Sequence, residues 1–330
     1  LRLVTPAEVT AGALSYRDIL VLPRLPNDLP LVGGTITAEP QTPLAHVNLL
    51  AHARGTPNLY LLDAPSDPRV APLLDTLVRF EVVRSGFSLE PTTVEQAEEF
   101  WAARAPARYV PERDLDFVGL PRFEELGFAD TPRVGSKAAN LGELRQLLGD
   151  TAPAGFAIPF SAYQAHLTGN PVTASGCGEA RASCEDPGRD APACDWAERR
   201  CVAGSDAGQS LAAYLDELLA DAEFLEDSRR RDAALAGLRA LIEAAPVPSP
   251  LAEELDARVA ELFADQSVKL RSSTNVEDLA DFNGAGLYES YRAAAAGDER
   301  ASSVVRKVWS SAWSFAAYEE RAWWNVDQSQ

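Results

Sequence analysis

The 330-residue chain lacks methionine altogether, has no apolar run long enough to cross a membrane, and is short of basic residues. A membrane-spanning helix needs about 20 consecutive apolar residues, so we expect no transmembrane segment. The 30 Lys and Arg residues stand against 49 Asp and Glu, and the formal net charge of −19 opposes binding to a phosphate backbone. We therefore expect no nucleic-acid partner, although a local basic pocket for a nucleotide remains compatible with this charge.

The absence of methionine has two interpretations. Either the chain, which begins at Leu1, is a processed or incomplete product, or its core uses leucine where methionine is expected. The hydrophobic share of 46% and the charged share of 24% are typical of a soluble globular protein. The length is sufficient for two domains of ordinary size, each with its own core.

Cysteine is scarce, and its four copies fall within 25 consecutive residues: Cys177, Cys184, Cys194 and Cys201. The segment has no histidine and none of the closely spaced cysteine pairs that are typical of zinc sites. We therefore favour two disulfides that cross-link a loop-like insertion, with free thiols as the alternative. Disulfides require an oxidising compartment, so we expect a periplasmic or secreted location.

The first 90 or so residues predict a compact α/β domain. Short runs rich in β-branched and other apolar residues indicate strands at 18–22, 32–37, 59–62, 77–83 and 86–89. The residues after His46 suit a short helix, which Gly55-Thr56-Pro57 ends. A helix over 95–104 follows, and after it a polar stretch that we interpret as a linker.

The rest of the chain predicts a second, mostly helical unit. A turn at 134–136 runs into a helix, and Ala/Leu/Glu/Arg-rich segments indicate helices over 210–245 and 251–264. Residues 268–271 indicate a strand, and a polar loop then leads to a helix over 302–322.

His46 is the first candidate for chemistry. It lies where a strand-and-turn segment gives way to a helix, and free backbone N–H groups at a helix N-terminus favour a bound phosphoryl group. The neutral imidazole nitrogen is a nucleophile near neutral pH, so histidine can accept a phosphoryl group. A surface or helix-capping histidine is the more common explanation for such a position taken alone.

The sequence around His46 resembles a known motif. Leu44-Ala45-His46 through Arg54-Gly55-Thr56-Pro57-Asn58 is similar to the phosphohistidine motif of phosphoenolpyruvate synthase, pyruvate phosphate dikinase and the α-glucan water dikinases. Ala51, Gly55 and Pro57 stand at the distances from His46 that this motif has. Six residues after the histidine, where the motif has an arginine, this chain has His52.

Three further segments resemble the ATP-grasp domain of the same families. Residues 134–141, with Lys137, are similar to its G-G-K-x-x-N-L opening, and 154–159 are similar to its P-x-G-F-x-I/V-P segment. Residues 270–290, with Arg271 and Glu277, closely resemble its R-S-S-x-x-x-E-D-L signature and the A-G-x-Y-E-S that follows. Residues 308–324, with Arg321, resemble its V-W-x-S-x-W and E-R-A helix. Outside this pattern, a solvated lysine, a salt-bridged arginine and a core helix are the ordinary interpretations.

The resemblance implies a fold in two parts. Residues 1–92 would form a swivelling β/β/α phosphohistidine domain, and residues 93–116 a linker. Residues 117–330 would form an α+β ATP-grasp domain that is incomplete at its C-terminus and carries the cysteine-rich insertion at about 171–205. The histidine domain comes first, which is the order of the glucan dikinases.

The resemblance also implies a function. An ATP-dependent dikinase-type phosphotransferase would pass a phosphoryl group through His46 to an acceptor such as a glucan or pyruvate. Lys137, Arg271, Glu277 and Arg321 would bind the nucleotide, and the ligands of Mg²⁺ are expected outside this chain. The alternative is a catalytically degenerate secreted protein, with a binding or structural role on the same scaffold. The sequence leaves the acceptor and the oligomeric state open.

We predict that the four cysteines form two disulfides within one surface insertion. The segment lacks apolar periodicity, so cross-links would supply order that a core does not. Non-reducing peptide mapping of protein from its native source should show no alkylatable thiol, and nested pairing of Cys177 with Cys201 and Cys184 with Cys194 is favoured. Four free thiols or stoichiometric zinc would refute both the bridges and the extracytoplasmic location.

Overall fold

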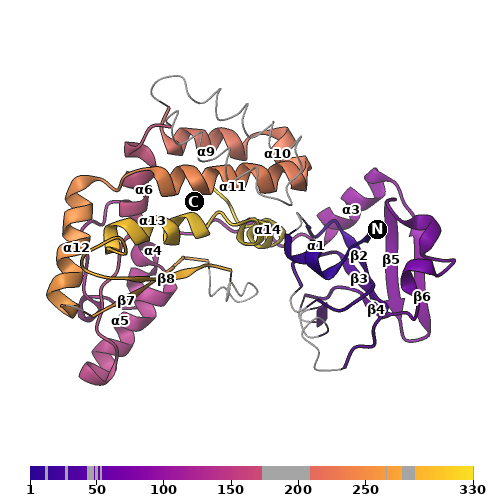
Figure 1. Ribbon diagram of the computed structural model, residues 1–330, viewed down its shortest axis with the longest axis horizontal. Coiled ribbons are helices and arrows are strands. Elements are labelled where there is room, and N and C mark those ends of the chain that lie inside the picture. The colour runs from indigo at the N-terminus through magenta and orange to yellow at the C-terminus, as the bar shows by residue number, and fades with distance from the viewer. Residues whose placement is uncertain are drawn as a thin grey trace. The chain divides into compact units, whose positions relative to one another are not determined.

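The computed structural model in Figure 1 describes residues 1–11, 14–26, 29–42, 48, 51–52, 54–172, 209–264, 266–276 and 287–329. The chain divides into two compact units, Leu1–Ala107 and Arg108–Gln330. The four cysteines, His46 and Glu277 lie outside the described residues, so the disulfides stay a prediction. Among the described helices, none is both long and apolar enough to cross a membrane.

The first unit contains a parallel sheet of four short strands in the order β1-β2-β3-β4 (Figure 1). The strands are β1 (Arg2–Leu3), β2 (Ile19–Leu22), β3 (Gly34–Thr37) and β4 (Asn58–Tyr60), and helix α1 (Pro6–Ala11) connects the first two. Successive β2 side chains pack on opposite faces of the sheet, because side-chain direction alternates along a strand. Leu20 and Leu22 join Val9 in one core cluster, whereas Val21 joins Ile36 in another. A strand buried on both faces requires the uniformly apolar sequence found here.

An antiparallel hairpin and a helix complete this unit. The hairpin pairs β5 (Val78–Val83) with β6 (Gly86–Pro91), and the helix is α3 (Val94–Arg104). Thr93 and Gln96 form a capping box at the start of α3. The Trp101 ring packs edge-on against Tyr16, with the ring centroids 5.8 Å apart, so α3 belongs to the first unit. Short 3-10 helices η1 (Ala64–Ser66) and η2 (Ala71–Leu73) lie between β4 and β5.

The second unit is mostly helical around a two-stranded antiparallel sheet, β7 (Val268–Arg271) with β8 (Ser290–Ala293). Its described helices are α4 (Thr131–Val134), α5 (Ser136–Leu148), α6 (Phe160–Gly169), α9 (Leu211–Leu219), α10 (Ala222–Glu226), α11 (Ser228–Ala244), α12 (Ser249–Phe263), α13 (Ala301–Ser311) and α14 (Phe315–Trp323), with the 3-10 helices η3 (Phe123–Glu125), η4 (Phe128–Asp130) and η5 (Gly149–Thr151). In Figure 1, α9 and α10 lie above α11, which contacts both of them and also packs on α13. Helix α13 in turn packs on α12, β7 and β8.

Two predicted helices were wrong in their length. The segment 210–245 forms three helices, because Asp221 and Asp227 accept hydrogen bonds from the backbone N–H groups that follow them and so begin new helices. The segment 302–322 forms two helices, because Ser314 accepts a hydrogen bond from the Ala317 N–H and caps α14. Short polar side chains can accept hydrogen bonds from backbone N–H groups and so begin a new helix within a helix-forming segment. A prediction that averages helix propensity over a window of residues does not include this effect. The predicted strand 268–271 is confirmed as β7.

A buried histidine connects α6 to the end of α11. His166 is fully buried, with Nε2 3.1 Å from the Ile242 carbonyl oxygen and Nδ1 3.3 Å from the Asn170 amide nitrogen. Its ring also packs on Trp309, with the centroids 5.0 Å apart. Burial lowers the pKa of His166, so the ring is neutral and donates from Nε2.

The lowered pKa predicts that the second unit loses stability in acid. The unfolded chain binds a proton at this histidine below about pH 6.5, where the folded state does not, so stability falls as the pH decreases through that value. The free energy of unfolding, measured in urea between pH 7 and 5, should fall less steeply in His166→Gln, by up to about 1.4 kcal/mol per pH unit. His52→Gln, at an exposed position, is the control. Equal slopes in the wild type and His166→Gln would contradict this role.

Candidate functional site

The start of α5 packs against the end of β7, and a glycine makes this contact possible. Gly135 has φ 80° and ψ 165°, and a Cβ at this position would lie 2.4 Å from the carbonyl carbon of Ser273. The Ser136 N–H donates to the Thr274 carbonyl oxygen at 2.9 Å, and the Ala138 N–H donates to Ser273 Oγ at 3.0 Å. The contact therefore joins two predicted motifs that are 135 positions apart in the sequence.

A cavity of about 810 Å³ opens beside this contact. It is lined by Lys137 from the first turn of α5, Arg271 from the end of β7 and Arg321 from α14. The structure thus brings three of the predicted site residues to one cavity. Their predicted partners His46 and Glu277 lie outside the described residues.

The cavity is basic although the protein is acidic. Among the described lining residues the only carboxylate is Asp327, whose Oδ2 lies 2.6 Å from Nη2 of Arg108. The basic side chains that line it are Arg113, Lys137, Lys269, Arg271 and Arg321. A concentration of positive charge inside a chain of net charge −19 favours an anionic ligand such as a nucleotide phosphate.

The two predicted arginines differ in how they are held. Arg321 is only 7% exposed, and its Nε donates to Gln328 Oε1 and its Nη1 to the Ala312 carbonyl oxygen, both at 2.8 Å. Its guanidinium also lies over the Trp313 ring, 5.4 Å from the centroid. Arg271 is exposed and makes no hydrogen bond or ion pair with any residue that the structure describes. Arg321 is therefore a charge held in a fixed position, whereas the paired N–H donors of the Arg271 guanidinium are available to a ligand.

Two hydroxyls of the arginine signature are buried at the cavity wall. Ser272 Oγ and Thr274 Oγ1 have no hydrogen-bond partner among the described residues. A buried hydroxyl without a partner costs about 1–3 kcal/mol, so it is normally satisfied by another group. Polar atoms of a bound ligand would supply hydrogen-bond partners for the hydroxyls of Ser272 and Thr274.

Aromatic and aliphatic side chains form the rest of the wall. A Cβ at Gly155 would lie 2.2 Å from the Phe123 ring, so only glycine allows the segment 154–159 to pack here. The neighbouring Phe156 and Ile158 line the cavity. Burial raises the pKa of Tyr163 to about 12, and this neutral hydroxyl accepts a hydrogen bond from the Trp313 indole. An apolar wall beside basic groups matches the two parts of a nucleotide, the base and the phosphates.

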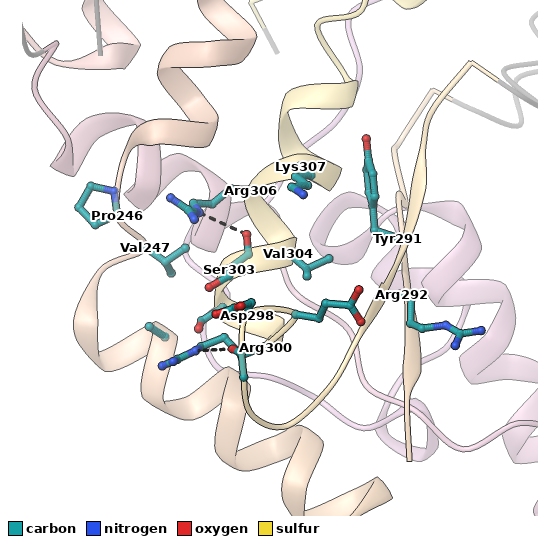
Figure 2. Close-up of a pocket in the computed structure, with 14 residues that line it drawn as sticks. Pro246, Val247, Tyr291, Arg292, Asp298, Arg300, Ser303, Val304, Arg306 and Lys307 are labelled. Carbon is teal, nitrogen blue, oxygen red and sulfur yellow. Dashed lines mark hydrogen bonds between the residues drawn. The ribbon is translucent and has the colours of Figure 1, made fainter. Parts of the chain in front are cut away.

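A second cavity of about 600 Å³ lies between α13, β8 and the turn that joins them, as Figure 2 shows. Its charges are mixed, because Asp298 and Glu299 line it together with Arg292, Arg300 and Lys307. Arg300 Nε donates to the Gly297 carbonyl oxygen of the same turn at 3.1 Å. None of the predicted site residues with a described position lines this cavity, so the basic cavity is the candidate site.

The class of protein follows from three features of this site: the basic cavity, the helix start that requires Gly135, and the apolar wall. Together these features are typical of a nucleotide-binding protein. Residues 131–330, more than half of the chain, match the family model of the pyruvate phosphate dikinase AMP/ATP-binding domain. The chain belongs to this family, and so to the superfamily of phosphoenolpyruvate synthase and pyruvate phosphate dikinase.

Curated relatives agree with the family. The chain is 28% identical over 226 residues to the phosphoenolpyruvate synthase of Pyrococcus furiosus, and 28% identical over 213 residues to a probable phosphoenolpyruvate synthase of Pyrococcus horikoshii. Each match covers 63% of this chain and 25% of the relative. The chain thus spans about a quarter of the length of these relatives.

Sequence reasoning missed two basic residues of the cavity. Lys269 lies two positions before Arg271 on β7 and thus on the same face of the strand, a spacing that would have identified it. Arg113 falls in the segment interpreted as a linker, where no periodicity or motif marks it. The described residues contain no group of three or more His, Cys, Asp or Glu that could hold a metal ion, and Mg²⁺ ligands outside this chain stay a prediction.

We predict that Arg271 binds the nucleotide phosphates through the paired N–H donors of its guanidinium. Arg271→Ala should weaken ATP binding by about tenfold or more, and Arg271→Lys by less, because lysine keeps the charge but loses the paired donors. Isothermal titration calorimetry with ATP measures both. Arg292→Ala is the matched control, since Arg292 is an exposed arginine of the neighbouring strand β8 but does not line the basic cavity. Unchanged affinity in Arg271→Ala would show that the signature has a structural role only.

Proposed function

We propose that the chain is part of an ATP-dependent phosphotransferase of the dikinase type that passes a phosphoryl group through His46. The β-phosphoryl group of ATP would form a bond to the imidazole and leave AMP, and the γ-phosphoryl group would go to water or phosphate. The observation that carries the proposal is the basic cavity where Lys137, Arg271 and Arg321 meet. Phosphoryl transfer depends mainly on positioning and charge neutralisation, which such a cavity supplies.

Each basic group has a distinct part in this proposal. Lys137 supplies a point charge at the start of α5, where the helix dipole also favours phosphate. Arg271 supplies the paired donors of a guanidinium, and Arg321 supplies a charge whose position is fixed by its neighbours. Glu277 is proposed to orient one of these cations. Mg²⁺, when bound, would neutralise part of the phosphate charge.

The described residues on either side of His46 support its role as carrier. Gln41 and Asn58 exchange hydrogen bonds of 2.8 and 2.7 Å through their side-chain amides, and Asn58 Nδ2 also donates to Asn48 Oδ1 at 3.2 Å. Gly55, with φ 64°, follows helical residues 51 and 52 at the position where the motif ends its helix. The hydrogen-bonded side-chain amides of Gln41, Asn48 and Asn58 therefore flank His46 in the sequence.

The first unit would act as a swivelling carrier. It is compact by itself, with its own core clusters, and it is joined to the second unit by a single chain connection. A tethered carrier keeps the phosphohistidine at high effective concentration for both the nucleotide and the acceptor. The relatives named as phosphoenolpyruvate synthases favour a small acceptor such as pyruvate, and the order of the domains favours a glucan.

The four clustered cysteines favour a second candidate function. Disulfides would place the protein outside the cytoplasm, where ATP is scarce. A catalytically degenerate secreted protein would then use this scaffold for binding or structure. The two candidates differ in whether the chain forms a phosphohistidine.

Labelling with ATP tests the carrier role. Incubation of the full-length protein with ATP labelled at the β-phosphorus should give acid-labile label on the protein, whereas ATP labelled at the γ-phosphorus should give none. His46→Ala should abolish the label, and His52→Ala, six residues further along, should retain it. Label that persists in His46→Ala would exclude this histidine as the carrier. A full-length wild-type protein that binds ATP but takes up no label would favour the degenerate protein.

A further inference from the structure

The segment Arg108–Asp114, here called the strap, begins the second unit and is bound to the end of α14. The Tyr109 N–H donates to the Asn325 carbonyl oxygen at 3.0 Å, and the Asp327 N–H donates to the Tyr109 carbonyl oxygen at 2.9 Å. Arg108 forms an ion pair with Asp327 at 2.6 Å. These contacts fix the first residues of the strap beside Val326 and Asp327, which line the basic cavity.

The other end of the strap is fixed on both sides of Arg113. The Glu112 carbonyl oxygen accepts a 2.8 Å hydrogen bond from Nδ2 of Asn275, which itself lines the cavity. The Asp114 N–H donates to the Pro132 carbonyl oxygen at 2.7 Å. The Asp114 carboxylate binds Arg133 Nε at 2.9 Å, and this bond lowers the pKa of Asp114. The backbone at position 113 is therefore held at the cavity wall.

The side chain of Arg113 has no comparable partner. It is half-buried, lines the cavity, and makes no hydrogen bond or ion pair with any residue in the described part of the chain. Arg108 of the strap and Arg133, which binds the Asp114 carboxylate, both have carboxylate partners. A fixed backbone with an uncompensated guanidinium at a basic cavity is the arrangement that an anionic ligand completes.

We propose that Arg113 is a further phosphate-binding residue of the nucleotide site. The inference rests on the proposed function, because it takes the ligand of the cavity to be a nucleotide. Arg113 precedes residues 131–330, the part that matches the family model, so the match does not supply this residue. It lies six residues after Ala107, the last residue of the first unit. A nucleotide bound to Arg113 would therefore contact the strap, which is the segment that directly follows the first unit.

The test compares ATP affinity among variants of the strap in the 330-residue chain. Arg113→Ala should weaken ATP binding by about tenfold or more, because a charge-assisted hydrogen bond is lost, and Arg113→Lys should restore part of the affinity. The urea unfolding midpoint of Arg113→Ala should equal that of the wild type, since the side chain binds no described residue. Arg292→Ala, at an exposed arginine of β8 that does not line the basic cavity, is the matched control and should keep wild-type affinity.

Two results would overturn the inference. Wild-type affinity in Arg113→Ala would show that the side chain does not reach the ligand. An equal loss of affinity in Arg292→Ala would show that the effect comes from the loss of any arginine of this unit and not from the position of Arg113. Arg271→Ala, measured beside them, separates this inference from the proposed function. If Arg271→Ala loses affinity and Arg113→Ala does not, the inference alone fails, whereas a wild-type chain that does not bind ATP overturns both.

Discussion

The second unit depends on one close backbone contact, the packing of Gly135 against Ser273. A side chain at position 135 would overlap the Ser273 backbone, and the positive φ there disfavours any other residue. This contact sets the start of α5 against the end of β7, and the hydrogen bonds of Ser136 and Ala138 hold it. Lys137 and Arg271 reach the same cavity because the two backbones approach so closely.

The charge of the cavity opposes the charge of the chain, and this contrast gives the site its chemistry. Across the structure many arginines are neutralised by nearby carboxylates, as Arg133 is by Asp114 and Asp130. The buried Arg231 and Glu319 likewise pair with each other between α11 and α14. At the cavity only one of the described lining residues is acidic and five are basic, so the lining has a net positive charge. Membership of an AMP/ATP-binding family is consistent with this electrostatic pattern.

The strap shows how a connecting segment becomes part of a binding site. Its residues carry no periodic pattern, yet their backbone groups bind the ends of α14 and β7 and the start of α4. The contacts with the ends of α14 and β7 join segments more than 100 positions apart in the sequence, as between Glu112 and Asn275. The boundary between the two units, after Ala107, therefore comes only a few residues before Arg113, which lines the cavity.

The sequence by itself determined the local elements and the family. Uniformly apolar β2 and the strand at 268–271 follow from side-chain character alone, and Lys137, Arg271 and Arg321 follow from motifs whose residues are contiguous. Only the tertiary structure decided that these three residues share one cavity, that Arg113 joins them, and that capping by Ser314 divides the last helix. The physical reason is the range of the interactions. Propensity and motif act between neighbours in sequence, whereas the cavity is made by backbone contacts between distant segments.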